Sequence, residues 1–429
     1  MKQLAVIGGG WAGLTAAVHA TGAGHRVTLI EMAPQLGGRA RSLAAAATAP
    51  RLDNGQHILI GAYTHCLHLF ATLGVDAGQA LLRLPLRLRY SDHEGLRLRP
   101  GAPLPAFARA VLGYRAWPLG ARLRLLARSL GWSLAGFRCA PGLSVAQLCA
   151  GLPAPVYREL IAPLCVAALN TPAEQASAQV FLRVLRDALF SGPGSSDLLL
   201  PRRPLSELLA EPAQTWLQAR GATLRLGRRV QHIAAQEAAW LVDGERFDAL
   251  LLACPALEAA RLVEPFAPRW SDAARALRFE PIITVYLQSP GSMLPAPMVA
   301  LTEGSEAPAQ FAFDLGQLGH APGLFACVIS GAGPWVERGL EAAGAATLAQ
   351  ATQQLRWQGE APTVLRVLAE KRATFACTPG LQRPAMHVAP GLLAAGDYVD
   401  GPYPATLEGA VRSGAAAAAA LQGAWDRRA

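Results

Sequence analysis

The first 31 residues constrain this chain most, because they read as a strand, a glycine-rich turn, a helix and a second strand. Residues 4–7 form a short apolar run that is typical of a buried strand. The spacing Gly8-x-Gly10-x-x-Gly13 allows a tight turn, a close approach of the backbone to a pyrophosphate, and close packing of the helix on the strand. The pattern predicts a dinucleotide site at the start of the helix, where free N–H groups and the helix dipole favour phosphate.

An acidic residue strengthens the prediction of a dinucleotide site. Residues 27–30 read as the second strand, and Glu31 at its end can accept hydrogen bonds from a ribose. Glu31 follows the third glycine at about the 20-residue distance that this fingerprint requires. Trp11 and Ala12 lie inside the turn and are expected to contact the cofactor with it. The alternative, an ordinary βαβ turn, needs neither the glycine spacing nor the acid.

The residues after Glu31 indicate which dinucleotide binds. Gly37-Gly38-Arg39 and the following Ser42 resemble the E-x5-G-G-R-x-x-S extension of the FAD-dependent amine oxidase and carotenoid desaturase superfamily. Nicotinamide dehydrogenases lack this extension, so the resemblance implies FAD as the cofactor. It places Gly38 in a tight loop beside the FAD and gives Arg39 a cationic fork for the phosphates. The alternative is a Gly-Gly turn with solvated arginines.

A second polar stretch, Asp53-Asn54-Gly55-Gln56-His57, stands between apolar neighbours. Asp, Asn and Gly favour turns, and a plain turn is the simpler interpretation. In the resembled superfamily, however, a D-x-G element runs past the isoalloxazine ring after the GGR loop. The form D-N-G-Q-H is similar to that of a narrower group, the hydroxysqualene dehydroxylases. The resemblance implies that Asn54, Gly55 and Gln56 contact the flavin.

The end of the chain repeats the order of strand, turn and helix around Gly396-Asp397. Asp397 is expected to bind the ribityl or pyrophosphate end of the flavin. The resemblance places Ala405 and Thr406, where a helix of small residues begins, toward the flavin ring. An internal stretch also returns to the α/β pattern, and the residue that matches Val230 lies at the adenine in the superfamily.

These elements predict an α/β protein with a discontinuous, Rossmann-like FAD-binding domain and an α+β substrate domain that holds a mixed or antiparallel sheet. A chain of 429 residues is long enough for two such domains. The expected FAD-binding domain comprises residues 1–83, 200–260 and 386–429. The expected substrate-binding domain comprises residues 84–199 and 261–385.

The narrower resemblance implies a reaction in which hydrogen replaces the allylic hydroxyl of hydroxysqualene to give squalene, as in squalene and hopanoid biosynthesis. FAD would bring the redox chemistry, and the protein would supply position and electrostatics. The departing hydroxyl needs a proton, for which His57 is the candidate acid. The developing allylic cation needs electron-rich neighbours, for which Tyr398 and Tyr403 are candidates. The electron donor is not indicated.

Two alternatives remain at the level of the sequence. A carotenoid-type desaturase or an amine oxidase with the same fold would oxidise its substrate instead of reducing it. A non-catalytic carrier of prenyl lipids would keep the fold without the chemistry. The intact G-x-G-x-x-G, GGR and G-D elements count against a carrier, which would not need all three.

Charge and composition limit the partners. The formal net charge is +9, but the arginines are dispersed and no nucleic-acid motif accompanies them, so we expect no nucleic-acid partner. The mean hydropathy is +0.24, yet no apolar run of 18 residues occurs, and we expect no membrane span. Seven scattered cysteines without a C-x-x-C pair indicate buried thiols in a reducing, cytoplasmic compartment. His65, Cys66 and His68 point to different faces of the expected helix, so we expect no metal site.

Residues 105–138 are apolar and rich in arginine. Four leucines recur there at helical spacing: Leu119, Leu123, Leu126 and Leu130. Arg124 and Arg128 fall on the opposite face. The simpler interpretation is a helix that packs its leucines on the core. The alternative is a basic amphipathic helix that holds the protein peripherally on the inner face of the cell membrane, where a polyprenyl substrate partitions.

Overall fold

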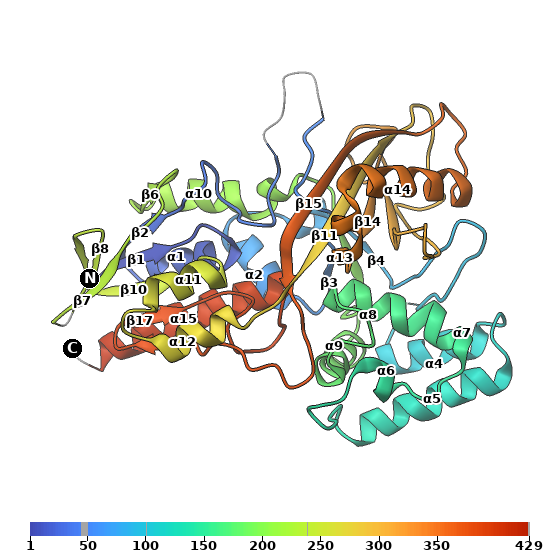
Figure 1. The fold of residues 1–429 in the computed structure, drawn as a ribbon, viewed down its shortest axis with the longest axis horizontal. Coiled ribbons are helices and arrows are strands. Elements are labelled where there is room, and N and C mark those ends of the chain that lie inside the picture. Colours follow the sequence, from blue (N-terminus) through green and yellow to red (C-terminus); the bar gives the residue numbers. More distant parts are fainter. Residues whose placement is uncertain (44–49, 100, 238, 428–429) are drawn as a thin grey trace.

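A six-stranded sheet organises one half of the molecule in the computed structural model, which describes residues 1–43, 50–99, 101–237 and 239–427 (Figure 1). The strand order is β16-β17-β10-β1-β2-β6. The bounds are β1 Gln3–Ile7, β2 Arg26–Ile30, β6 Thr223–Arg225, β10 Ala249–Leu252, β16 His387–Ala389 and β17 Leu392–Ala394. All pairs are parallel except β16 with β17, which is antiparallel. The sheet therefore draws on three separate parts of the chain.

Helices cover both faces of this sheet, which explains why its strands are almost entirely apolar. On one face, Leu4 and Val6 of β1 join the core formed with α1 (Trp11–Gly22) and α15 (Leu407–Asp426). On the other face, Ala5 and Ile7 join the core formed with α11 (Ala256–Val263) and α12 (Pro268–Arg275). Because successive side chains of β1 point to opposite faces of the sheet, they pack into two separate cores.

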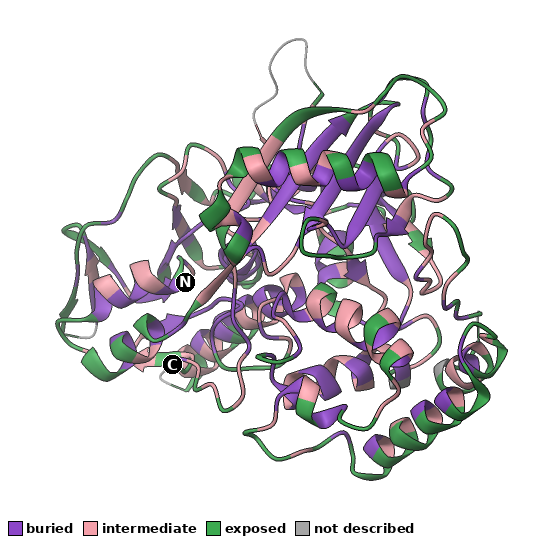
Figure 2. Ribbon diagram, turned by 45° about the vertical axis from the view of Figure 1, so that its right-hand side comes forward, coloured by how far each residue is buried: buried purple, intermediate pink, exposed green. Residues whose placement is uncertain are grey.

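A five-stranded antiparallel sheet organises the other half, in the order β12-β13-β14-β11-β15. Its strands are β11 Phe279–Gln288, β12 Met298–Ala300, β13 Phe311–Asp314, β14 Leu324–Ile329 and β15 Thr363–Phe375. The helices α13 (Gly333–Arg338) and α14 (Leu340–Gln354) lie on one face of it, and the residues between this face and α14 are buried (Figure 2). Its other face packs on a group of helices from the middle of the chain.

That helical group lies below the antiparallel sheet in Figure 1. Its members are α4 Pro103–Gly113, α5 Leu119–Leu134, α6 Val145–Leu148, α7 Ala154–Val156, the π-helix η1 Tyr157–Ile161, α8 Ala162–Leu169 and α9 Ala178–Phe190. The remaining helices are α2 Thr64–Thr72, α3 Ala77–Ala80, η2 Ser206–Ala210 and α10 Glu211–Gln218. Two small sheets complete the fold: β3 Leu59–Ile60 with β5 Leu198–Pro201 and β4 Leu81–Leu84, and β7 Ile233–Gln236 with β8 Ala239–Val242 and β9 Glu245–Phe247.

The structure confirms the predicted fold class: a discontinuous, mostly parallel α/β part is joined to an α+β part with an antiparallel sheet. The domain boundaries stay a prediction. In the described part of the chain, no helix combines the length and the apolar character needed to cross a membrane.

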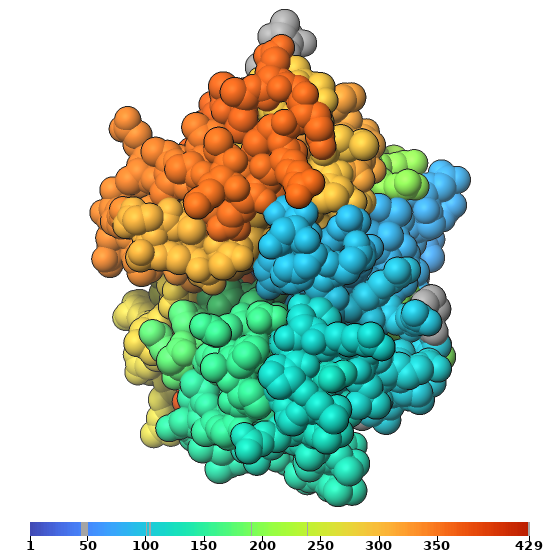
Figure 3. All heavy atoms as spheres, turned by 90° about the vertical axis from the view of Figure 1, so that its right-hand side faces the viewer, coloured from blue at the N-terminus to red at the C-terminus, as the bar shows by residue number. Residues whose placement is uncertain are grey.

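The interpretation of α5 as a helix that packs its leucines on the core holds only for Leu126, which is half-buried against the core of the helical group. Leu119, Leu123 and Leu130 are 57%, 51% and 61% exposed. The residues that α5 buries are instead Ala121, Leu125 and Trp132. The helix therefore turns its apolar stripe outward, on the side of the molecule where the α4 and α5 segment forms the teal surface of Figure 3.

Candidate functional site

A cavity of about 500 Å³ is lined by residues of both halves of the molecule. Most of the residues predicted for the cofactor or for catalysis line it: Gly8, Gly10, Trp11, Ala12, Glu31, Gly38, Arg39, Asn54, Gly55, Gln56, His57, Val230, Gly396, Asp397, Tyr398, Ala405 and Thr406. Gly13 and Tyr403 are absent from the lining. The sequence analysis missed the lining residues of the antiparallel half: Ala167, Ala168, Asn170, Ile282, Ser330, Glu370, Ala373 and Thr374.

The glycine-rich turn has the shape that a pyrophosphate needs. A Cβ on Gly8 would lie 2.5 Å from the Ala253 carbonyl oxygen, and a Cβ on Gly13 would lie 1.9 Å from the Gly8 carbonyl oxygen. These two glycines are therefore required by packing, which is why Gly13 lies behind the cavity wall. A Cβ on Gly10 would meet only Gly38 Cα, at 3.9 Å, so the turn is open at Gly10.

Unpaired donors beside this turn fit an anionic group. The first helical hydrogen bond of α1 runs from Leu14 N to Gly10 O at 2.9 Å, so the preceding N–H groups, including those of Trp11 and Ala12, have no partner within the helix. Nε of Arg41 is buried at the cavity without a hydrogen-bond partner among the described residues. The sequence analysis missed Arg41, because it occupies a variable position of the GGR extension.

Glu31 is held in place at the end of β2 by two backbone donors. Its Oε2 accepts from Gly9 N at 2.6 Å, and its Oε1 accepts from Ala33 N at 2.7 Å. Each carboxylate oxygen has a second lone pair, so Glu31 can still accept from ribose hydroxyls. Val230 lines the cavity too and is buried, which suits contact with an adenine.

Arg39 has a partner that the sequence did not suggest. Its Nη2 donates to Oδ1 of Asp397 at 2.5 Å, and its Nη1 donates to the Ala373 carbonyl oxygen at 2.7 Å. Burial is the largest single influence and lowers the pKa of Arg39, but the charge and hydrogen bond of Asp397, together with the charge of Glu370, raise it overall. Arg39 thus joins the GGR loop, the C-terminal turn and β15 across the cavity.

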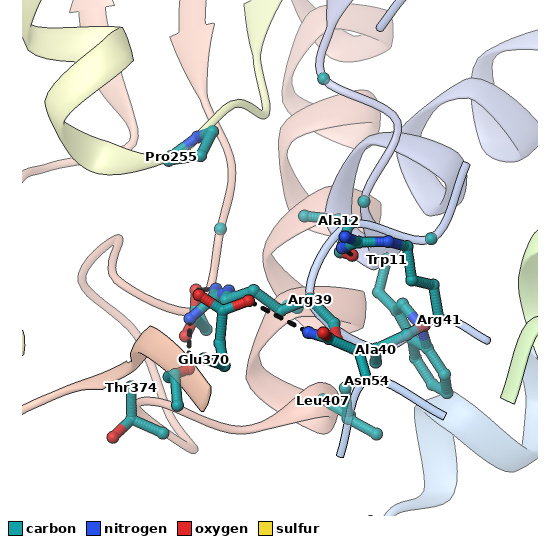
Figure 4. A pocket seen from close by; sticks show the side chains of 18 of the residues that line it. Trp11, Ala12, Arg39, Ala40, Arg41, Asn54, Pro255, Glu370, Thr374 and Leu407 are labelled. Carbon is teal, nitrogen blue, oxygen red and sulfur yellow. Dashed lines mark hydrogen bonds and ion pairs between the residues drawn. The ribbon is translucent and has the colours of Figure 1, made fainter. Parts of the chain in front are cut away.

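Asn54 and Asp53 are adjacent in the sequence, but their side chains lie in different surroundings. Asn54 lines the cavity, and its Nδ2 donates to the Arg39 carbonyl oxygen at 3.1 Å and to Oε2 of Glu370 at 3.0 Å (Figure 4). Asp53 turns away, and its Oδ1 accepts from Ser42 Oγ at 2.6 Å and Leu205 N at 3.0 Å. Burial raises the pKa of Asp53 to about 6.

His57 lies in the cavity wall, and its burial favours the neutral form. Its Nδ1 is 2.9 Å from the Gly55 carbonyl oxygen. A carbonyl can only accept, so Nδ1 must carry the proton and Nε2 of the neutral ring is an acceptor. Burial has the largest effect and lowers the pKa of His57; the hydrogen bond to Gly55 opposes it, and the charge of Arg39 lowers the pKa further. The tautomer presents an acceptor at Nε2.

The two candidate tyrosines occupy different places. Tyr398 lines the cavity, is buried, and donates its hydroxyl to the Cys254 carbonyl oxygen at 3.2 Å. Tyr403 lies outside the lining, and its ring already faces two cations, since the guanidinium carbons of Arg412 and Arg183 lie 4.7 and 5.8 Å from its centroid.

No group of three or more His, Cys, Asp or Glu side chains is arranged to hold a metal ion within the described ranges. The polar groups of the cavity are instead helix N–H groups, guanidinium groups and carboxylates of the kind that bind a dinucleotide.

Comparison with known proteins agrees with this geometry. Residues 11–422 match the family described as flavin containing amine oxidoreductase. The fold resembles that of an oxidoreductase from Methanosarcina mazei, with a TM-score of 0.73 and 17% identity over 96% of this chain and 99% of that one. It also resembles cyclohexylamine oxidase from Brevibacterium oxydans, with a TM-score of 0.70 and 16% identity over 99% of each chain.

The chain belongs to the flavin-containing amine oxidoreductase family and is an FAD-dependent oxidoreductase. It is 30% identical to hydroxysqualene dehydroxylase from Rhodopseudomonas palustris, over 97% of each chain. It is 27% identical to hydroxysqualene dehydroxylase from Sinorhizobium fredii, again over 97% of each chain. These relatives confirm the resemblance to the hydroxysqualene dehydroxylases and, with the family, FAD as the cofactor.

Proposed function

We propose that this protein removes the hydroxyl of hydroxysqualene reductively and releases squalene, in the pathway that supplies squalene and hopanoids. The observation that carries the proposal is the full-length similarity to three relatives with the name hydroxysqualene dehydroxylase, each covering 97% of this chain. The similarity to a probable zeta-carotene desaturase from Synechococcus elongatus is weaker, 25% identity over 67% of this chain. A 15-cis-phytoene desaturase from Capsicum annuum matches 98% of this chain, but at 24% identity. The higher identity to the dehydroxylases favours a dehydroxylase over a desaturase.

The cavity residues support this proposal by their chemistry. When bound, FAD in its reduced form supplies the hydride. The N–H groups that begin α1, including those of Trp11 and Ala12, would bind its pyrophosphate, and Glu31 its ribose. Asn54, Gly55, Gln56, Ala405 and Thr406 would border the isoalloxazine, Asp397 the ribityl or pyrophosphate end, and Val230 the adenine.

The opposite wall suits a long apolar substrate that carries one hydroxyl. Ala167, Ala168 and Ile282 supply apolar surface there, while Asn170 and Glu370 supply polar groups. His57, as a neutral ring with Nε2 as an acceptor, would orient the substrate hydroxyl by accepting its hydrogen. Tyr398 would face the substrate with its ring, because its hydroxyl is used by a backbone carbonyl.

Incubating the reduced enzyme separately with hydroxysqualene, squalene and phytoene tests the proposal. We expect squalene from hydroxysqualene and no product from the other two. Oxidation of squalene or phytoene would favour the alternative of a carotenoid-type desaturase. A purified protein that releases no FAD and turns over nothing would favour the prenyl-lipid carrier.

We also propose that residues 105–138 hold the protein peripherally on the inner face of the cell membrane. Six leucines of α4 and α5 are exposed: Leu104, Leu112, Leu119, Leu123, Leu130 and Leu134. Neither helix contains Asp or Glu, whereas Arg109, Arg122, Arg124 and Arg128 lie on them. An exposed apolar stripe flanked only by cations suits an anionic lipid surface, in which a polyprenyl substrate also dissolves.

A further inference from the structure

Glu370 stands out on the wall of the cavity that the antiparallel half contributes. Among the described residues that line this wall, it is the only acid. It lies at a bulge of β15, because Glu280 pairs with Thr374 while Ile282 pairs with Glu370, so the segment of β15 between these pairs is longer than that of β11. Bulges re-aim side chains and occur beside active sites. Here Glu370, Ala373 and Thr374 all line the cavity.

The carboxyl of Glu370 is held by two hydrogen bonds, with the charge of Arg39 nearby but no direct ion pair. Oε2 accepts from Asn54 Nδ2 at 3.0 Å, and Oε1 accepts from Arg372 N at 3.3 Å. Figure 4 shows Glu370 and Asn54 joined in this way beside Arg39. Arg39 is already paired with Asp397 at 2.5 Å, and no ion pair of Glu370 within 4.0 Å is found in the part of the chain that the structure describes.

The other ionisable groups of the cavity are less suited to give a proton to a substrate. His57 donates from Nδ1 to a carbonyl and presents an acceptor at Nε2. Tyr398 donates its hydroxyl to a backbone carbonyl. Asp397 is paired with Arg39, and Glu31 accepts two backbone N–H groups at the end of β2. Glu258, a further carboxyl of the lining, is paired with Arg229 and Arg261. Glu370 is the carboxyl that remains.

We propose that Glu370 is the catalytic acid that protonates the leaving hydroxyl, an inference that rests on the proposed dehydroxylation. The proton of its carboxyl moves to the hydroxyl oxygen, the C–O bond breaks, and water leaves with the electron pair of that bond. The hydride that forms the new C–H bond, with its electron pair, is supplied by reduced FAD. Glu370 is left as a carboxylate and regains a proton from solvent.

The test compares two leaving groups in Glu370→Gln. Glutamine keeps the size and an oxygen that can accept from Asn54, but it cannot act as an acid. The substrates are hydroxysqualene and its allylic chloride analogue, because chloride leaves without a proton. General acid catalysis contributes roughly 10²- to 10⁴-fold, so the alcohol should react slower by about that factor, while the chloride should change by less than about tenfold. FAD content and the reduction potential of the bound flavin should stay at the parent values.

Glu341→Gln, at an exposed position of α14, is the matched control and should behave as the parent with both substrates. An equal slowing of both leaving groups would overturn the acid role, because it would assign Glu370 to cation stabilisation or packing. If Glu370→Gln converted hydroxysqualene at the rate of the parent enzyme, the acid role of Glu370 would be overturned, whereas the proposed function would stand. A parent that converts the chloride but never the alcohol would overturn the proposed function, and the acid role with it.

Discussion

Gly8 and Gly10 lie close together in the sequence, but the protein requires a glycine at each position for a different reason. A Cβ on Gly8 would collide with the Ala253 carbonyl, and its φ of +109° is unfavourable for other residues, whereas a Cβ on Gly10 would enter open space. We therefore expect Gly10→Val to fold normally and lose most of its FAD, while Gly8→Val fails to fold. Flavin absorbance per protein and thermal unfolding measure the two effects. Full flavin occupancy in Gly10→Val would contradict the placement of the pyrophosphate.

Glu31→Ala removes the expected ribose partner. A hydrogen bond to a charged group contributes about 1.5–3 kcal/mol, so FAD affinity should fall by roughly 10- to 150-fold. Titration of the apoprotein with FAD, followed by flavin fluorescence, measures the loss. An unchanged affinity would show that Glu31 serves only the Gly9 and Ala33 N–H groups.

His57→Phe separates two roles for that ring. The sequence alone suggested an acid, and loss of an acid costs about 10²- to 10⁴-fold in rate. The tautomer in the structure instead favours an acceptor, and loss of one ordinary hydrogen bond costs about 0.5–1.5 kcal/mol, roughly 2- to 13-fold. We expect the smaller effect, with FAD still bound. A loss of 100-fold or more in the turnover of hydroxysqualene would restore His57 as the acid.

The raised pKa of Asp53, about 6 in the folded protein, makes stability depend on pH. The native state binds this proton more tightly than the unfolded chain does, so the contribution is complete below about pH 4 and is lost as the pH rises through about 6. A shift of about two units corresponds to about 3 kcal/mol in the free energy of unfolding. Urea unfolding across this range should show that loss in the parent and not in Asp53→Asn. If the free energy of unfolding changed with pH in the same way in both proteins, the contribution of Asp53 would be contradicted.

Residues of the cofactor site were predictable from the sequence where they lie in local motifs. The Gly8 to Gly13 turn joins β1 to α1 within a few residues, and the Gly396-Asp397 turn directly follows β17. Glu370 had no local signal, because it reaches the cavity through the pairing of β15 with β11, opposite Ile282. The ion pair of Arg39 with Asp397 was equally hidden, since it joins the two ends of the chain.

At the scale of an element, α5 shows what periodicity can and cannot tell. The spacing of its leucines correctly indicated an amphipathic helix, but periodicity does not say whether protein or another medium covers the apolar face. The side chains that α5 buries are Ala121, Leu125 and Trp132, which lie on a different face of the helix from the exposed leucines. Whether protein covers the apolar face of α5 depends on which other segments of the chain pack beside the helix.

The outer face of α5 can be tested with anionic liposomes. Leu123→Ser with Leu130→Ser removes exposed apolar surface, and Arg124→Gln removes one cation that is worth about 1 kcal/mol near an anionic surface. We expect weaker liposome flotation of both variants at unchanged thermal stability. Leu340→Ser, exposed at 39% on α14, is the control and should float as the parent does. Equal flotation of all variants would contradict the membrane proposal.

At the scale of the whole molecule, the cavity exists only where the two halves meet. The parallel half supplies the motifs for FAD, and the antiparallel half supplies the substrate wall with Glu370. Arg39 links them through the Ala373 carbonyl of β15 and the Asp397 carboxylate. This division explains why the family resemblance was readable from the motifs, whereas the substrate wall became visible only in the structure.

An anaerobic single turnover tests the central claim most directly. The reduced enzyme is mixed with hydroxysqualene, and the absorbance of oxidised flavin is followed together with the amount of squalene formed. We predict that oxidised flavin and squalene appear together, one for one, and that squalene or phytoene leaves the flavin reduced. If squalene or phytoene instead bleached the oxidised enzyme while hydroxysqualene left the reduced enzyme unchanged, the protein would be an oxidising desaturase.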